Sequence, residues 1–268
     1  MLPQPNAYRS IFRHLDGSYD WKKELEFGWQ TIDQASSGSL AACIVECIQG
    51  DGGIHVLPSG YLQALKQHCE RRGMLLIIDE AQTGLGRTGR MFAFEHHGVV
   101  PDILTLSKPL ANGLPLSAMV TRAEIDGAGR QNGFLFFTTH TNDPLVAAVG
   151  NKVLDIVLRD DLVTNAKVRG EQLVRGLQYL QRKYSFVGDV RGCGLMAGIE
   201  IIKGAGGDCK DHDPELAMRI SELMWKAGLW CQLQSGTVFR IGPRINCTSA
   251  EIAQGLEILE EVFDNVNT

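Results

Sequence analysis

The sequence predicts an α/β fold in which a mainly parallel sheet is flanked by helices, followed by a smaller α+β unit. Two observations predict the sheet. The apolar run from Met74 to Ile78 has no alternation with polar residues, which is typical of a strand buried on both faces. Strand-like runs also alternate with helix-like stretches along the first half of the chain, a rhythm typical of parallel sheets.

The first 150 residues supply the elements of this sheet and form the larger of two predicted domains. Residues 1–20 are rich in Pro, Asn, Asp and Gly and are expected to form an irregular arm. After this arm, apolar residues at helical spacing alternate with uninterrupted apolar runs. These patterns predict helices over 19–34 and 61–72, weak helices over 92–97 and within 122–137, and strands over 40–48, 74–78, 103–106, 116–120 and 134–137.

Residues 151–268 form the second predicted domain, which helices link to the first. Asp143 and Pro144 are typical of a helix N-cap and first turn, and helices are expected over 143–158 and 162–184. The remainder has enough apolar residues for a core of its own. Its expected elements are strands over 195–202 and 238–241, a mobile Gly- and Asp-rich loop over 204–212, a helix from Asp213 to a stop at Gly228, and a last helix opened by a Thr248–Glu251 capping box.

Composition argues against several classes of protein. The chain has 268 residues, 44% of them hydrophobic and 21% charged, which is an ordinary balance for a soluble globular protein. Its net charge of −5 argues against nucleic-acid binding, and no apolar run approaches the roughly 18 residues of a membrane helix. The seven cysteines are scattered, Cys43 and Cys47 are not spaced as zinc ligands, and the N-terminus lacks a secretory signal. We therefore expect a cytoplasmic protein that binds neither metal, membrane nor nucleic acid.

Two chemically useful side chains lie where predicted strands end. Asp79 ends the strand over 74–78, and Lys108 follows the strand over 103–106. Open α/β sheets place their chemistry at the carboxyl ends of their strands. A lysine amine can form a Schiff base with an aldehyde, and a carboxylate can keep a pyridine nitrogen protonated, so the pair suits pyridoxal phosphate. By spacing alone, an ordinary strand-end aspartate and a surface lysine remain the simpler interpretation.

Gly84–Gly89 matches the G-x-G-x-x-G pattern of dinucleotide-binding proteins. That pattern must directly follow a strand and open a helix, with an acidic residue about twenty positions later. Here four residues separate Asp79 from the pattern, only a weak helix follows it, and no acidic residue lies near position 109. Turn glycines are therefore a better interpretation than a nucleotide site.

Several motifs occur in an order that resembles the class III, ornithine- and GABA-type aminotransferases. They are Asp79–Gly84, Gly86–Gly89, Pro101–Ile103, Ser107–Lys108, Thr138–His140, Gly188–Gly192 and Phe239–Ile241. Because they extend in order over nearly the whole chain, they are more specific than any single short pattern. The likeness is greatest to 2,2-dialkylglycine decarboxylase, a member of that family. The resemblance implies fold type I of the pyridoxal-phosphate-dependent transferases, with residues 1–150 as the major part of the cofactor-binding large domain and 151–268 as the small domain.

The resemblance also implies roles for five residues. In the family, the lysine at Lys108 is bonded to pyridoxal phosphate and shuttles a proton, and the carboxylate at Asp79 pairs with the pyridine nitrogen. The residue at Gln82 lies near the ring hydroxyl, and the threonine at Thr139 reaches the cofactor phosphate of the other subunit of a homodimer. The arginine at Arg240 binds the substrate α-carboxylate, which suits its planar fork. The implied reaction transfers an amino group from an amino acid to a 2-oxo acid.

The chain departs from the family pattern at two places, and the second bears on the substrate. Glu46–Cys47 stands where the family usually has Glu-Pro, which removes turn rigidity but keeps the charge. Gly50–Asp51 replaces serines of the decarboxylase and is closer to ω-aminotransferases, in which a carboxylate pairs with the arginine at Arg240. If Asp51 reaches Arg240, ω-amino substrates and ordinary transamination are favoured. If Asp51 falls short, transamination coupled to decarboxylation of a 2,2-dialkylglycine is favoured.

The chain begins well inside the family pattern, so we expect it to be truncated at its N-terminus. The portion that precedes this point in the family carries a glycine-led phosphate cup, an aromatic ring that stacks on the cofactor, and a glutamine used by the decarboxylase. Two hypotheses follow. The protein is an active pyridoxal-phosphate-dependent aminotransferase, or it is a catalytically inactive paralogue that acts only through dimerisation.

Overall fold

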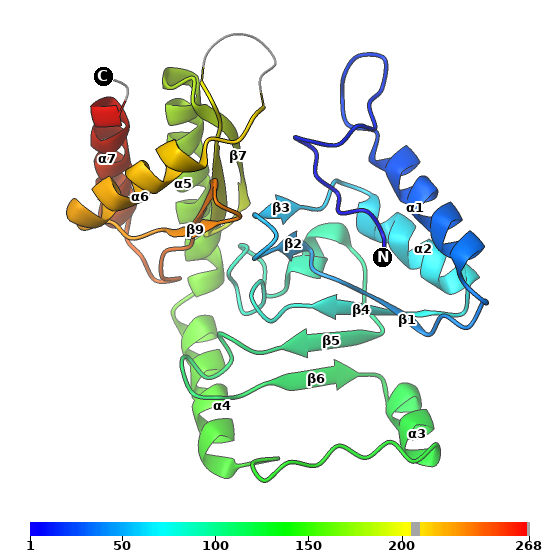
Figure 1. The fold of residues 1–268 in the computed structure, drawn as a ribbon. Helices are drawn as coiled ribbons and strands as arrows, with labels where there is room; N and C mark the ends of the chain where they lie inside the picture. The colour runs from blue at the N-terminus through cyan, green and yellow to red at the C-terminus, as the bar shows by residue number, and fades with distance from the viewer. Residues whose placement is uncertain (205–209, 267–268) are drawn as a thin grey trace.

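The computed structural model describes residues 1–204 and 210–266 and contains two four-stranded sheets with helices packed against them (Figure 1). Most of the loop expected over 204–212 lies outside the described residues. In chain order the elements are α1 (Trp21–Ala35), β1 (Ala42–Val45), β2 (Ile48–Gln49), β3 (His55–Val56), α2 (Tyr61–Arg71), β4 (Leu75–Asp79), the 3₁₀ helix η1 (Ala93–His97), β5 (Ile103–Leu106), β6 (Ala118–Thr121), α3 (Ala123–Gln131), α4 (Pro144–Arg159), α5 (Leu162–Lys183), β7 (Val187–Cys193), β8 (Met196–Ile201), α6 (Pro214–Lys226), β9 (Gln232–Gln234), β10 (Val238–Ile241) and α7 (Ser249–Val266).

The first sheet has the strand order β1-β4-β5-β6 and is mainly parallel, as predicted. β4 pairs in parallel with both β1 and β5, and Asp79 lies opposite Thr105 of β5. β6 instead runs antiparallel to β5. The connection over 107–117 contains no helix and is too short for a parallel crossover, which needs a dozen or more residues.

The first core lies between β4 and the helices α1 and α2. Leu76 and Ile78 of β4 are fully buried and share this core with Trp29 of α1 and Leu62 of α2. The intervening residues of β4, which point to the opposite face, are only half-buried. The predicted burial of this strand on both faces is therefore complete on one face only.

The single buried strand predicted over 40–48 is wrong. β1 ends at Val45, and β2 belongs to a separate ribbon in which it pairs antiparallel with β3. The chain turns here because the carboxylate of Glu46 accepts a hydrogen bond of 2.9 Å from the backbone nitrogen of Gly50. β1 also lies at the edge of the sheet, so Ile44 is 63% exposed.

The strand predicted over 134–137 is also wrong. These residues follow α3 without regular structure, and their four apolar side chains are between 62% and 85% exposed. No strand of the described residues pairs with them. The apolar residues over 134–137 therefore form an exposed surface segment and not a buried strand.

The second sheet has the order β7-β8-β10-β9 and is antiparallel throughout. Helices α5, α6 and α7 contribute with this sheet to one core, which includes the fully buried Leu177, Ile220 and Phe263. The predicted helix starts are confirmed. Asp143 and Asp213 accept hydrogen bonds from the first turns of α4 and α6, and Thr248 and Glu251 form the reciprocal bonds of a capping box.

Helices α4 and α5 connect the two sheets. Val153 and Leu154 of α4 pack against the first core, whereas Leu173 and Leu177 of α5 belong to the second core. The domain boundary after residue 150 stays a prediction. Among the described residues, no helix combines the length and the apolar character needed to cross a membrane.

Candidate active site

Asp79, Gln82 and Lys108 lie at the carboxyl ends of β4 and β5. These strands are parallel neighbours, so their ends meet at one edge of the sheet. Asp79 Oδ1 accepts a hydrogen bond of 2.9 Å from the backbone nitrogen of Ala81, and its other oxygen has no protein partner among the described residues. Lys108 Nζ donates a hydrogen bond of 2.9 Å to Gln82 Oε1. The edge therefore presents an amine and a carboxylate oxygen that remains available.

Asp102, within the Pro101–Ile103 motif, fixes the relation between these two strands. Its Oδ2 accepts a hydrogen bond of 2.8 Å from the backbone nitrogen of Leu76 at the start of β4, and its Oδ1 pairs with Arg122 at 2.9 Å. Because Asp102 immediately precedes β5, it holds the two strands at a defined register. The Pro101–Ile103 motif is therefore explained by the pairing of β4 with β5 beneath the site.

The loop after β2 lies against the same edge. A Cβ atom placed on Gly50 would fall 2.3 Å from Gln82 Oε1, so a larger residue here would displace the Gln82 amide from its present position. The next residue is Asp51, whose side chain is 81% exposed. The close approach therefore brings Asp51 towards the edge that carries Lys108.

Arg240 of β10 meets Asp51 from the second sheet. Arg240 Nη1 donates a hydrogen bond of 2.9 Å to Asp51 Oδ1, and the same oxygen accepts a hydrogen bond of 2.9 Å from Gln234 Nε2. The other terminal nitrogen of Arg240 donates to Gln232 Oε1. The arginine thus has one nitrogen on a carboxylate and one on an amide oxygen.

Sequence reasoning identified Asp51 and Arg240 but missed Gln232 and Gln234. Both glutamines belong to β9, and Gln232 lies directly opposite Arg240 in the ladder between β9 and β10. A Gln-x-Gln alternation just before a strand that carries a candidate arginine was the available signal, because alternate residues of a strand share a face.

Thr139 does not join this group. It lies in an exposed turn in which the backbone nitrogen of Thr138 bonds to Thr141 Oγ1 at 3.0 Å. In the part of the chain that the structure describes, Thr139 makes no polar contact with the other five candidate residues. Its role stays a prediction.

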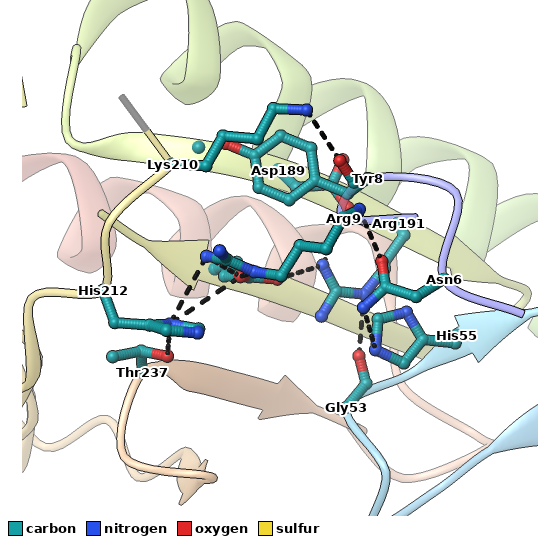
Figure 2. A network of polar contacts seen from close by, with 12 residues as sticks. Asn6, Tyr8, Arg9, Gly53, His55, Asp189, Arg191, Lys210, His212 and Thr237 are labelled. Carbon is teal, nitrogen blue, oxygen red and sulfur yellow. Dashed lines mark hydrogen bonds and ion pairs between the residues drawn. The ribbon is translucent and has the colours of Figure 1, made fainter. Parts of the chain in front are cut away.

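A buried ion network fixes the loop that carries Asp51 to the second sheet. Figure 2 shows Arg191 of β7 beside Gly53, and Arg191 Nε donates a hydrogen bond of 2.7 Å to the carbonyl oxygen of Gly53. Arg191 also pairs with Glu200 at 2.8 Å, and Glu200 pairs with Arg9 of the N-terminal arm. Burial alone would raise the pKa of Glu200, but the two guanidinium groups outweigh it and hold that pKa below its usual value. Glu200 therefore remains charged and keeps both arginines in place.

Comparison with known proteins identifies the family. A family model described as aminotransferase class-III matches residues 2–263. The chain belongs to the class III aminotransferase family. An uncharacterised aminotransferase of Schizosaccharomyces pombe is 49% identical over 98% of this chain and 59% of its own length. The leucine/methionine racemase of Thermococcus litoralis is 33% identical over 99% of this chain and 59% of its own length.

A solved transaminase structure has the same fold. An amine transaminase from an uncultivated Pseudomonas species, in its pyridoxal-phosphate-bound form, superposes with a TM-score of 0.88 and 31% identity. The match covers 98% of this chain and 61% of that one. The chain therefore spans about three fifths of the length of the relatives it matches.

The family and its solved members indicate pyridoxal phosphate as the cofactor. Two side chains at the edge of the sheet suit two parts of pyridoxal phosphate. Lys108 offers a primary amine for its aldehyde, and the available oxygen of Asp79 offers a partner for its pyridine nitrogen. Among the described residues, no group of three or more His, Cys, Asp and Glu side chains could hold a metal ion.

Proposed function

We propose that this class III chain transfers an amino group from an amino acid to a 2-oxo acid with pyridoxal phosphate, and that it accepts ω-amino donors. The observation that carries this proposal is the hydrogen bond between Arg240 and Asp51. It supports ordinary transamination over the decarboxylating subtype, because a free Arg240 was the condition for the latter.

Lys108 and Asp79 have complementary roles in this proposal. When bound, pyridoxal phosphate supplies an electron-withdrawing ring that stabilises negative charge at the substrate carbon that bears the amine. Lys108 would hold the cofactor through Nζ and then move the proton to and from that carbon. Asp79 keeps the ring nitrogen protonated through its available oxygen. Gln82 orients Lys108 Nζ through their hydrogen bond and would serve as a partner for the ring hydroxyl.

Arg240 and Asp51 together select the substrate. When Asp51 occupies Nη1, the positive charge of Arg240 is neutralised, and an ω-amino donor meets no unpaired cation beside its reacting carbon. When Asp51 turns away, the freed guanidinium can bind the α-carboxylate of the 2-oxo acid through two parallel hydrogen bonds. One site can thus accept both partners of a transamination in turn.

We further propose that the protein assembles as a homodimer with Thr139 serving the cofactor phosphate of the partner subunit. The support is the surface beside Thr139, where four consecutive apolar side chains are exposed (Phe134, Leu135, Phe136 and Phe137). A contiguous exposed apolar segment of this kind is typical of a protein interface.

Product analysis tests the proposed function. The protein is incubated with pyridoxal phosphate, pyruvate and either 4-aminobutyrate or 2-aminoisobutyrate. We expect alanine from the ω-amino donor and no carbon dioxide from the dialkyl donor. Carbon dioxide and alanine formed together from 2-aminoisobutyrate would instead support the decarboxylating subtype. A protein that binds no cofactor and turns over neither donor would support the inactive alternative.

A further inference from the structure

We infer that Gln234 is a specificity-determining residue that holds Asp51 on Arg240 and so sets how readily the arginine accepts a substrate carboxylate. The inference rests on the proposed transamination and deepens it, because it adds a third residue to the selection of substrate. Gln234 acts through Asp51 and is a positioning residue.

The first observation is the hydrogen bonding of Gln234. Its side chain is only 7% exposed, and its Nε2 donates to Asp51 Oδ1 at 2.9 Å. Its Oε1 is buried and has no hydrogen-bond partner among the described residues. A buried acceptor without a partner costs free energy that an apolar side chain would avoid. In the part of the chain that the structure describes, the bond to Asp51 is the one hydrogen bond that this side-chain amide makes.

The second observation is that the backbone beside Asp51 is fixed. Arg191 holds the carbonyl oxygen of Gly53, and the next residue, Ile54, is fully buried with a φ of 60°. A β-branched residue in this left-handed region is strained, and such strain persists only where the surroundings over-determine it. A Cβ on Gly198 of β8 would lie 3.0 Å from Ile54, so the second sheet lies directly against it.

These two observations identify how the Asp51–Arg240 pair opens. Because the backbone of the loop is anchored, Asp51 leaves Arg240 by rotation of its exposed side chain and not by movement of the loop. That rotation breaks the bond to Gln234 as well as the bond to Arg240, since both end on the same Oδ1 atom. Removing the glutamine amide therefore makes Arg240 easier to free and favours ligands that carry a carboxylate.

The experiment compares Gln234→Leu with the parent protein in two backgrounds, one with Asp51 and one with Asp51→Ser. Binding of 2-oxoglutarate to the cofactor-loaded protein is measured by isothermal titration calorimetry. We expect Gln234→Leu to tighten binding about five- to tenfold when Asp51 is present and less than twofold when it is absent. The ratio of kcat/KM for L-alanine to that for 4-aminobutyrate should rise by a similar factor only in the Asp51 background.

Gln181→Leu is the matched control, because Gln181 is a half-buried glutamine whose amide bonds at 3.1 Å to Gly188, remote from Asp51. It should leave both measurements unchanged. An equal change in both backgrounds, or no change in either, would overturn the inference. The binding measurement does not require turnover, so absence of transamination by the parent protein would reject the proposed function without deciding the role of Gln234.

Discussion

Arg240 Nη1 donates a hydrogen bond of 2.9 Å to Asp51 Oδ1, although the two residues are 189 positions apart in the chain. Asp51 comes from a loop that touches Gln82 at the edge of the first sheet, and Arg240 comes from a strand of the second. The contact therefore joins the arginine proposed to bind a substrate carboxylate on one sheet to the sheet that carries Lys108 and Asp79.

Replacing Asp51 by serine should shift the substrate preference. Without the Asp51 carboxylate, Arg240 Nη1 loses its partner and the charge of the guanidinium is no longer neutralised. Donors that carry an α-carboxylate should therefore react more efficiently, and ω-amino donors less efficiently. We expect the kcat/KM ratio of L-alanine to 4-aminobutyrate to rise roughly threefold to tenfold, since Asp51 is exposed and its pair with Arg240 is screened by solvent. Asp155→Ser on the exposed face of α4 is the control, and an unchanged ratio for Asp51→Ser would contradict the proposed selection.

Replacing Lys108 by alanine should abolish covalent attachment of pyridoxal phosphate. The amine that bonds to Gln82 at the end of β5 is the one proposed to react with the cofactor aldehyde. Borohydride reduction followed by peptide mass spectrometry should find the cofactor on Lys108 in the parent protein and nowhere in the variant. Lys167→Ala should keep the label, and trapping on a different lysine would refute the assignment.

The proposed homodimer should depend on the apolar surface beside Thr139. A charge placed there by Phe136→Asp would have to be buried without a partner, so we expect the variant to be monomeric and to bind cofactor poorly. Light scattering measures the mass, with Leu15→Asp in the exposed N-terminal arm as the control. A parent protein that is monomeric and fully active would rule the dimer out.

Two helical glycines should respond oppositely to alanine. A Cβ on Gly170 of α5 would lie 2.2 Å from backbone atoms of Gly194, whereas a Cβ on Gly255 of α7 meets nothing within 4 Å. We expect Gly170→Ala to lower the free energy of unfolding by roughly 2–3 kcal/mol and Gly255→Ala to raise it by about 0.5–1 kcal/mol. Urea denaturation measures both, and a tolerated alanine at Gly170 would mean that α5 can move away from the turn between β7 and β8.

His55 should make the fold less stable in mild acid. Burial and the nearby Arg191 lower the pKa of His55 to about 4. Between that value and the unfolded pKa of about 6.5, the unfolded chain binds a proton that the folded chain does not, so stability falls as the pH falls. From pH 7 to pH 5 the contribution of His55 is a loss of roughly 2 kcal/mol.

The measurement is urea unfolding at the two pH values. His55→Asn should show a smaller loss of stability between pH 7 and pH 5 than the parent protein, whereas His140→Asn in an exposed turn should show the full loss. The pKa of Glu200 lies below its usual value. Protonation of Glu200 therefore lowers stability at a more acidic pH and does not obscure the comparison between pH 7 and pH 5. Equal losses in all three proteins would show that His55 is not the group responsible.

Much of this protein was determined by the sequence itself. The apolar runs that end at Asp79 and before Lys108 specify two strands, and parallel pairing brings their ends to one edge regardless of the details of packing. The helix starts at Asp143 and Asp213 were equally predictable, because a cap is satisfied by backbone groups within the next three residues.

Only the tertiary structure decided the rest. The apolar run over 40–48 continues through a point where Glu46 bonds to the backbone of Gly50 and the chain leaves the sheet, so local hydrophobicity could not reveal the break. The contact of Asp51 with both Arg240 and Gln234 depends on how two separate sheets pack. The alternation of Gln232 and Gln234 could place both on one face of a strand, but it could not show that Asp51 contacts that face. Contacts between distant segments depend on how the side chains of both cores pack together. The order of the motifs therefore pointed to the family, but only the folded chain showed that Asp51 reaches Arg240.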